Sequence, residues 1–499
     1  MKYLIIFLII NNFLLPIYGN EIEYRIRQDL ISRQNQNSEI NNYRNEEELI
    51  QFIQATMETN LIPGLSISIV KEDNIAWEKH FGYANIDQNI IVDENTMFIL
   101  SSVSKTVTAT ALMQLFEDGL FSLDDDIDDY LPFQVNHPDF PFIPITFKML
   151  FSHTSGIKDN WNVMPYYDGD SELEIGYYLE QYLTPGGEFY SANGCFTNSE
   201  PGTNYTYSNN GAALIGYLVE QISNQPFNEY CNEHIFTPLG MDSAFWFLSE
   251  IDNLNQVAMP YQLAAGNGST CYEIGCGIYD ASNPCFCDFE CIYYGDCCSD
   301  YDEICGENGT GSSGTLEPAY HYGYSDYPSG QLRTTSNNLA KFMNAYINDG
   351  VYNGVRILDS ETINFIKTIH YPNTASQQGL IWYYKNQNQR TLFGHNGGDL
   401  GSLTEMFISY SDDIGVVLLS NSSNYSAMIQ IENAIFDFAE ETDFSIMGDI
   451  NSDNVINIQD IVLIVNLIMV GEYNSYADFN LDNIIDILDI VQIVNLILD

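Results

Sequence analysis

Eight of the ten cysteines in this 499-residue chain lie within residues 271–305, and this cluster is the feature that most restricts its possible folds. So many half-cystines in a short stretch leave almost no room for an apolar core, so disulfides must hold the segment together. The flexible stretches GNGST (266–270) and GENGTGSSGT (306–315) flank it. The sequence therefore predicts a small disulfide-rich module, residues 266–315, inserted into a larger domain formed by 20–265 and 316–442.

The start of the chain has the pattern of a secretory signal peptide. Met1 and Lys2 precede an apolar run from Tyr3 to Ile17, and small Gly19 offers a cleavage point. Two asparagines interrupt this run, which is shorter than the roughly 20 apolar residues that a membrane-spanning helix needs. We therefore expect residues 1–19 to be a signal peptide, no transmembrane segment, and a secreted protein that is extracellular or associated with the cell surface.

An exported chain folds in an oxidising compartment, where clustered cysteines form disulfides rather than zinc sites. The vicinal pair Cys297-Cys298, followed by Ser-Asp-Tyr, resembles the somatomedin B domain. That resemblance implies a module that binds other proteins; the alternative is a stable decoration on the larger domain. Outside the cluster, Cys195 and Cys231 could pair with each other. The cysteines expected in disulfides are Cys271, Cys276, Cys285, Cys287, Cys291, Cys297, Cys298 and Cys305.

The charge of the chain excludes one class of function. Lys and Arg number 16 against 68 Asp and Glu, which gives a formal net charge of −52. A nucleic-acid-binding protein needs a basic face, so we expect no nucleic-acid partner. The acid excess favours a soluble extracellular protein.

The stretch FILSSVSKTVTAT (98–110) carries a candidate nucleophile. The spacing in Ser102-Val103-Ser104-Lys105 places the Ser102 hydroxyl and the Lys105 amine on one helical face, in a known nucleophile motif. Lys105 must be desolvated so that its pKa falls and it can accept the serine proton. Ser101 shares this face, but at a helix start it is a natural N-cap, whereas the N–H of Ser102 would be free to hold an oxyanion.

Two further motifs supply groups that could face the same cleft. Tyr207 and Asn209 lie two residues apart before a small-residue helix, and Tyr207 could relay a proton if Lys105 lowers its pKa. In GHNGG, His395 is followed by Gly397 and Gly398 at an expected strand start, where a substrate could approach the backbone closely.

These three motifs, in this order, resemble the serine beta-lactamase and penicillin-binding-protein superfamily, most closely its class C beta-lactamase-like branch. PGLSISIV, LFSHTSGI and SGQLRTTSNNLAKFM also resemble that family, over roughly residues 46–440 without the insert. The resemblance implies Ser102 as the nucleophile, Lys105 and Tyr207 as the acid–base pair, and Asn209 as a substrate-orienting residue. It also implies that the N–H groups of Ser102 and Gly398 form the oxyanion hole, and that His153 is structural.

One departure from the family pattern bears on the substrate. Beta-lactamases carry Lys-Thr-Gly at the third motif, whereas this chain has His395-Asn396-Gly397, as in the esterase-like and D-aminopeptidase-like members. A neutral imidazole attracts a carboxylate weakly, so we expect an esterase or D-amino-acid peptidase that acts on a small ester, amide or peptide without a catalytic cofactor. The alternatives are a beta-lactamase or D-Ala-D-Ala carboxypeptidase, or a non-catalytic extracellular scaffold protein.

The tail, residues 446–499, is an internal repeat with calcium-loop spacing. Hard oxygen ligands at alternate loop positions suit calcium, and two structural Ca²⁺ ions are therefore expected. The duplicated loops and their helices resemble a type I dockerin, which implies a cohesin-like partner, although Ile458-Gln459 and Ile487-Leu488 replace the hydroxyl pair that often contacts it. The expected ligands are Asp449, Asn451, Asp453, Val455, Asn457 and Asp460, then Asp478, Asn480, Asp482, Ile484, Asp486 and Asp489.

The fold class that follows is a multidomain α+β protein. Residues 46–60 have helical spacing, two strands follow between 61 and 86, and three strands and a closing helix end the larger domain. We expect an antiparallel sheet flanked by helices together with a helical subdomain, as the family implies. The disulfide-rich insert and a small all-α calcium-binding C-terminal domain complete the architecture.

Overall fold

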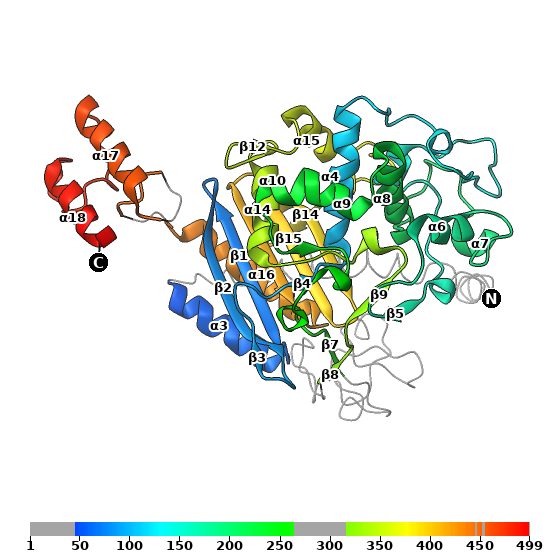
Figure 1. The fold of residues 1–499 in the computed structure, drawn as a ribbon, viewed down its shortest axis with the longest axis horizontal. Coiled ribbons are helices and arrows are strands. Elements are labelled where there is room, and N and C mark those ends of the chain that lie inside the picture. Colours follow the sequence, from blue (N-terminus) through cyan, green and yellow to red (C-terminus); the bar gives the residue numbers. More distant parts are fainter. Residues whose placement is uncertain (1–44, 264–315, 445–446, 452–454, 499) are drawn as a thin grey trace, which may run out of the picture.

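A seven-stranded antiparallel sheet lies at the centre of the larger domain, in the order β13-β14-β15-β16-β1-β2-β3 (Figure 1). The structure, a computed structural model, describes residues 45–263, 316–444, 447–451 and 455–498. The expected signal peptide and disulfide-rich insert lie outside these residues. The strands of the sheet are β1 (Gly64–Lys71), β2 (Asn74–Asn85), β3 (Ile90–Ile91), β13 (Tyr383–Gln387), β14 (Arg390–Asp399), β15 (Ser402–Ser409) and β16 (Ile414–Ser420).

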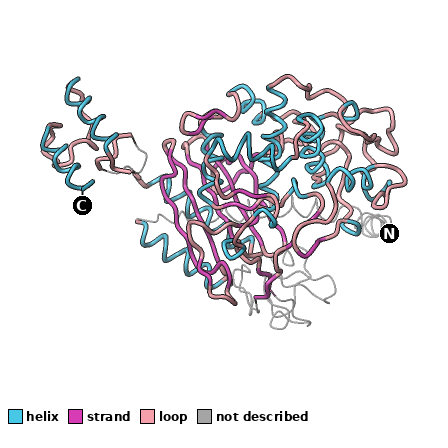
Figure 2. The backbone as a smooth tube through the Cα atoms, viewed as in Figure 1, coloured by secondary structure: helices cyan, strands magenta, loops and turns pink. Residues whose placement is uncertain are grey.

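Helices cover both faces of this sheet, as Figure 2 shows. On one face α3 (Glu46–Thr59) and α16 (Tyr425–Glu441) pack against an apolar cluster, and on the other α14 (Ser336–Ile347) packs against β1 and β16. Along β16, Val416 and Leu418 join the first cluster while Val417 and Leu419 join the second. Because successive side chains of a strand point to opposite faces, a strand buried on both sides has a continuous apolar sequence.

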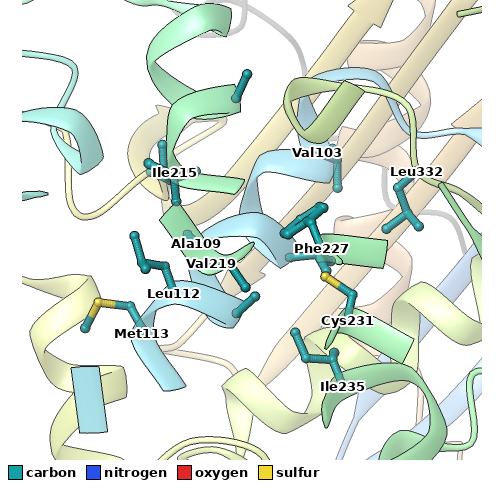
Figure 3. Close-up of a cluster of buried hydrophobic side chains, with 14 of the residues drawn as sticks. Val103, Ala109, Leu112, Met113, Ile215, Val219, Phe227, Cys231, Ile235 and Leu332 are labelled. Carbon is teal, nitrogen blue, oxygen red and sulfur yellow. The ribbon is translucent and has the colours of Figure 1, made fainter. Parts of the chain in front are cut away.

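A helical subdomain packs beside the face of the sheet that α14 covers. Its apolar side chains belong to the same buried cluster as that face. In Figure 3 the side chains of α4 (Ser104–Glu117), among them Leu112 and Met113, pack beside Ile215 and Val219 of α8 (Asn209–Ser223). The other helices of the larger domain are α5 (Phe147–Phe151), α6 (Ile175–Leu183), α7 (Ala192–Cys195), α9 (Phe227–Cys231), α10 (Thr237–Leu239) and α15 (Ser360–Lys367).

The remaining described strands are short. Three of these strands form a small sheet in the order β4 (Phe98–Ile99), β10 (Arg333–Thr334) and β6 (Ala244–Phe245). The others pair as β5 (Tyr166–Asp168) with β9 (Tyr322–Tyr324), β11 (Val351–Tyr352) with β12 (Val355–Arg356), and β7 (Tyr261–Leu263) with β8 (Leu316–Pro318). In the last pair Leu263 is opposite Leu316, and these residues border the segment that contains the predicted insert.

The two remaining cysteines do not form the disulfide considered from the sequence. Cys195 ends α7 and Cys231 ends α9, and both thiols are free and buried. In Figure 3 Cys231 lies among apolar side chains, including Phe227 and Ile235. Burial raises the pKa of both thiols, so they remain protonated and pack as small apolar groups.

The tail forms two helices beyond α16, namely α17 (Ile458–Val470) and α18 (Ile487–Leu498). They share a small apolar cluster of their own, centred on Ile464, Ala477 and Ile493. No helix in the described part of the chain is long and apolar enough to cross a membrane.

Candidate active site

Ser102 lies at the turn between β4 and α4, in a 3-10 segment that spans Ser101–Val103. The expectation that Ser101 caps the helix is wrong, because α4 begins only at Ser104 and Ser101 has a left-handed backbone with φ +47°. Its hydroxyl instead donates to Ser402 Oγ on β15, at 3.3 Å. A non-glycine residue in this region costs about 1–3 kcal/mol, and such strain clusters at functional sites. Here it turns the chain sharply just before Ser102.

Lys105 is buried beside Ser102, as its expected role requires. Its Nζ lies 3.0 Å from Ser102 Oγ and donates to the Ser329 carbonyl oxygen at 2.6 Å. Only 1% of the residue is exposed. Burial lowers the pKa of Lys105 from 10.5 to about 7, against the opposing influence of nearby aspartates. Near neutral pH a substantial fraction of this lysine is therefore a free amine that can accept the serine proton.

The N-terminus of α8 positions Tyr207 and Asn209. Lys105 Nζ lies 5.0 Å from the centre of the Tyr207 ring. The Asp159 carboxylate accepts the backbone N–H of Asn209 at 2.8 Å and its side-chain Nδ2 at 2.9 Å, and it also accepts the Ser208 hydroxyl. A carboxylate at a helix N-terminus is favourable because the first N–H groups have no partner within the helix. Asp159 thus fixes the orientation of Asn209, and no feature of the sequence had marked it.

His153 packs against Tyr207. The two ring centres are 4.5 Å apart, and Nδ1 of His153 accepts the backbone N–H of Ser208 at 3.3 Å. Burial keeps the pKa of His153 well below its usual value of 6.5, so the ring is neutral. The residue packs against Tyr207 and the turn that precedes Asn209, which makes it a positioning residue.

Strand β14 brings the third motif to the nucleophile. His395 lies in the second half of this strand rather than at the expected strand start. A Cβ on Gly397 would lie 2.4 Å from the Leu100 carbonyl oxygen and 2.9 Å from the backbone nitrogen of Ser102. Only glycine allows the strand to pack this closely against the turn that holds Ser102. Gly398, the next residue, is exposed and lines the cleft.

His395 is a buried, neutral imidazole, as the sequence indicated. Its Nδ1 donates to the Asn396 carbonyl oxygen, which can only accept, so Nε2 carries a lone pair. The side chain is 2% exposed, and burial together with the nearby Lys105 lowers its pKa to about 3. This position therefore presents a hydrogen-bond acceptor to the cleft instead of a positive charge.

All six candidate catalytic residues meet at one cleft of about 740 Å³. Five of them line it directly, and Lys105 contacts it through Ser102. Charged residues that the sequence did not single out also line it: Lys158, Asp159, Asp326 and Asp399. Burial, reinforced by the charge of Asp159, raises the pKa of Asp326 to about 7. The cleft thus combines a serine, a free amine, a phenol and an amide, the groups that acyl transfer through a serine requires.

The carboxylates of the tail loops are directed into the loops themselves. Asp460 accepts the N–H groups of Ile450 at 2.8 Å and of Asn457 at 2.8 Å, and Asp489 accepts those of Asn480 and Asp486 in the same way. Asn483 has φ +66°, so it occupies the sharp turn where calcium loops usually carry glycine. Within the described residues, which omit Asp453, no group of three or more Asp, Glu, His or Cys side chains converges as a metal site would. Calcium binding therefore stays a prediction.

Comparison with known proteins links this site to a family. The beta-lactamase family model matches residues 49–437. Penicillin-binding protein 4* of Bacillus subtilis is 28% identical over 176 residues, which cover 34% of this chain and 35% of that relative. The match thus spans about a third of the curated relative's length.

Solved structures share the fold. The octameric penicillin-binding protein homologue from Pyrococcus abyssi has a TM-score of 0.56 at 22% identity, over 84% of this chain and 81% of its own. The D-amino acid amidase from Ochrobactrum anthropi SV3 has a TM-score of 0.55 at 20% identity, over 79% and 100%. The family model covers well over half of the residues and includes all three motifs that meet in the cleft, and on that evidence this chain belongs to the beta-lactamase family.

Proposed function

We propose that this protein is a secreted serine hydrolase that acts through an acyl-enzyme at Ser102. The observation that carries the proposal is the buried amine of Lys105, 3.0 Å from the Ser102 hydroxyl and with its pKa lowered to about 7. A lysine with this pKa can take the serine proton at neutral pH, which turns a weak nucleophile into an effective one.

The reaction follows from the positions of the groups. Ser102 Oγ attacks the substrate carbonyl carbon as the serine proton passes to Lys105. The carbonyl oxygen becomes an oxyanion, which accepts hydrogen bonds from the N–H groups of Ser102 and Gly398. Tyr207, beside Lys105, passes the proton to the leaving group, so the C–N or C–O bond breaks and the acyl group stays on Ser102. Water then attacks the ester, one of its protons returns to Ser102 Oγ, and the acyl group leaves as a carboxylic acid.

An ester or a D-amino-acid amide or peptide is the preferred substrate class. The neutral His395 offers no positive charge for a substrate carboxylate. A D-amino acid amidase among the proteins of similar fold is in line with this preference. The second candidate is a beta-lactamase or D-Ala-D-Ala carboxypeptidase, which the similarity to penicillin-binding protein 4* favours.

We further propose that the tail binds two Ca²⁺ ions and, with the insert, contacts other proteins. Hard oxygen donors stand at the loop positions that calcium uses, and the closing carboxylates Asp460 and Asp489 are fully buried at the loop ends. The bound ions would neutralise the negative charge of these carboxylates and so stabilise the loops. A cohesin-like protein is the expected partner of the tail.

Labelling of the wild-type chain with a fluorescent fluorophosphonate and a fluorescent penicillin tests the proposed activity. We expect fluorophosphonate labelling that is lost in Ser102→Ala and retained in the matched control Ser101→Ala, whose hydroxyl is turned toward Ser402. If neither probe labels Ser102, the protein is a non-catalytic scaffold. Penicillin labelling with rapid turnover would favour the second candidate.

A further inference from the structure

Among the residues of β14 that line the cleft, His395 and Asp399 flank Gly397, which lies against the nucleophile. His395, Gly397 and Asp399 alternate along the strand and so share one face. Gly397 lies against the backbone of Ser102, as its short Cβ distance to that nitrogen shows. With a rise of about 3.3 Å per residue, His395 and Asp399 lie roughly 7 Å from Gly397 in opposite directions along the strand.

Asp399 is held in place by a tyrosine and by the backbone. Its Oδ1 accepts the Tyr166 hydroxyl at 2.8 Å and the Leu400 N–H at 2.8 Å. The Tyr166 and Tyr324 rings meet edge to face with centres 5.5 Å apart, and both line the cleft. The Tyr166 hydroxyl fixes the position of the carboxylate, and the two ring faces add an electron-rich wall.

A carboxylate beside tyrosine rings is suited to an ammonium group. The carboxylate supplies a charge-assisted hydrogen bond, and the aromatic faces attract the cation through their quadrupoles. A carboxylate has about four acceptor positions, and the hydrogen bonds from Tyr166 and Leu400 both go to Oδ1, so the Oδ2 side of Asp399 remains for a ligand.

The other end of the same face agrees with this assignment. His395 is 98% buried and lines the cleft, and within the described residues its Nε2 has no hydrogen-bond partner. Because Nδ1 carries the proton, Nε2 is an acceptor that needs a donor from the ligand. Lys158 also lines the cleft and immediately precedes Asp159, whose carboxylate caps α8. The two side chains that flank Gly397 on this face of β14 are therefore both acceptors.

On the basis of the proposed hydrolase activity at Ser102, we propose that the substrate carries an ammonium group, bound by Asp399 between Tyr166 and Tyr324. The substrate class is thus a cationic ester or amide, such as an amino acid derivative with a free amine. A substrate carboxylate at this position would be repelled by the Asp399 carboxylate. Asp399 is a specificity-determining residue next to the oxyanion-hole glycine.

Substituted phenylboronic acids test this assignment without knowledge of the natural substrate, because boron forms a reversible tetrahedral adduct with an active serine. The probes are 3-aminomethyl-, 3-methyl- and 3-carboxyphenylboronic acid. Their affinities are measured as protection of Ser102 against a fluorescent fluorophosphonate. We expect the aminomethyl compound to bind at least tenfold more tightly than the methyl compound, and the carboxy compound to bind most weakly.

Variants separate the charge effect from general damage. Asp399→Asn keeps the shape and most of the hydrogen bonds, and it should reduce the aminomethyl-to-methyl affinity ratio at least tenfold. The matched control Asp252→Asn, an exposed aspartate outside the cleft, should leave the ratio unchanged. Equal affinities in the wild type, or preference for the carboxylate, would overturn the ammonium subsite alone. Absence of any Ser102 label would overturn the proposed function and this subsite with it.

Discussion

The buried position of Lys105 predicts that the reactivity of Ser102 rises with pH through a midpoint near 7. Moving the pKa of this lysine from 10.5 to about 7 corresponds to about 5 kcal/mol of lost preference for the ammonium form. Because only the neutral amine accepts the serine proton, the reactive fraction falls about tenfold per pH unit below the midpoint. At pH 5 Ser102 should react roughly 100-fold more slowly than on the plateau near pH 9.

A second buried group titrates in the same range, and a variant separates the two. The pKa of Asp326 is also raised to about 7, and its negative charge stabilises the Lys105 ammonium. Such coupled groups share their apparent midpoints. Asp326→Asn removes the negative charge, so the midpoint should move to lower pH while the tenfold dependence persists. The histidines of the site do not interfere, because the pKa of His395 is about 3 and that of His153 is well below 6.5.

The assay is the second-order rate of fluorophosphonate labelling of Ser102 from pH 5 to 9, with circular dichroism to verify that the chain stays folded. A profile that is flat over this range, or a midpoint above pH 9, would refute the assignment of Lys105 as the buried base. A midpoint that disappears in Asp326→Asn would assign the titration to the carboxyl group.

Four other predictions follow from the same structure. Gly397→Ala should slow Ser102 labelling at least 100-fold, since its Cβ would meet the Leu100 carbonyl at 2.4 Å, whereas Gly211→Ala in α8 should not; equal effects would contradict the close strand packing. Lys385→Met should lower the free energy of unfolding by about 3–5 kcal/mol in urea denaturation, because it removes the cation that pairs with two buried glutamates, and an unchanged midpoint would contradict this. Alkylation of the denatured, unreduced chain should modify Cys195 and Cys231 only, and modification within residues 271–305 would exclude the predicted disulfides there. EDTA should increase proteolytic cleavage within residues 446–499 and added Ca²⁺ should reverse it; protection that does not depend on calcium would argue against the metal loops.

Much of the larger domain could be predicted from local patterns. The helical spacing of residues 46–60 corresponds to α3, and the apolar runs near the end of the domain correspond to β14, β15 and β16. These elements are buried on one or both faces, so hydrophobic periodicity records them directly. Lys105 is buried with a lowered pKa, the condition that its predicted role as proton acceptor requires.

The rest of the site depends on tertiary contacts. Ser101 does not cap α4, since packing against β15 turns its hydroxyl toward Ser402. Asp159, Asp326 and Asp399 come from three separate segments, and only the fold brings them to one cleft. In a chain with 68 acidic residues, no local pattern distinguishes these three from the solvated majority.

The central claim is that an acyl-enzyme forms on Ser102, and acid-quenched mass spectrometry tests it most directly. The wild-type chain is mixed with p-nitrophenyl acetate, quenched within the turnover time and digested. We predict an acetyl group on the Ser102 hydroxyl in the peptide that spans residues 98–110, and no acetylated peptide from this region in Ser102→Ala. An acetyl group on Ser101, Ser104 or Lys105 in place of Ser102, or nitrophenol release that continues undiminished in Ser102→Ala, would contradict the account.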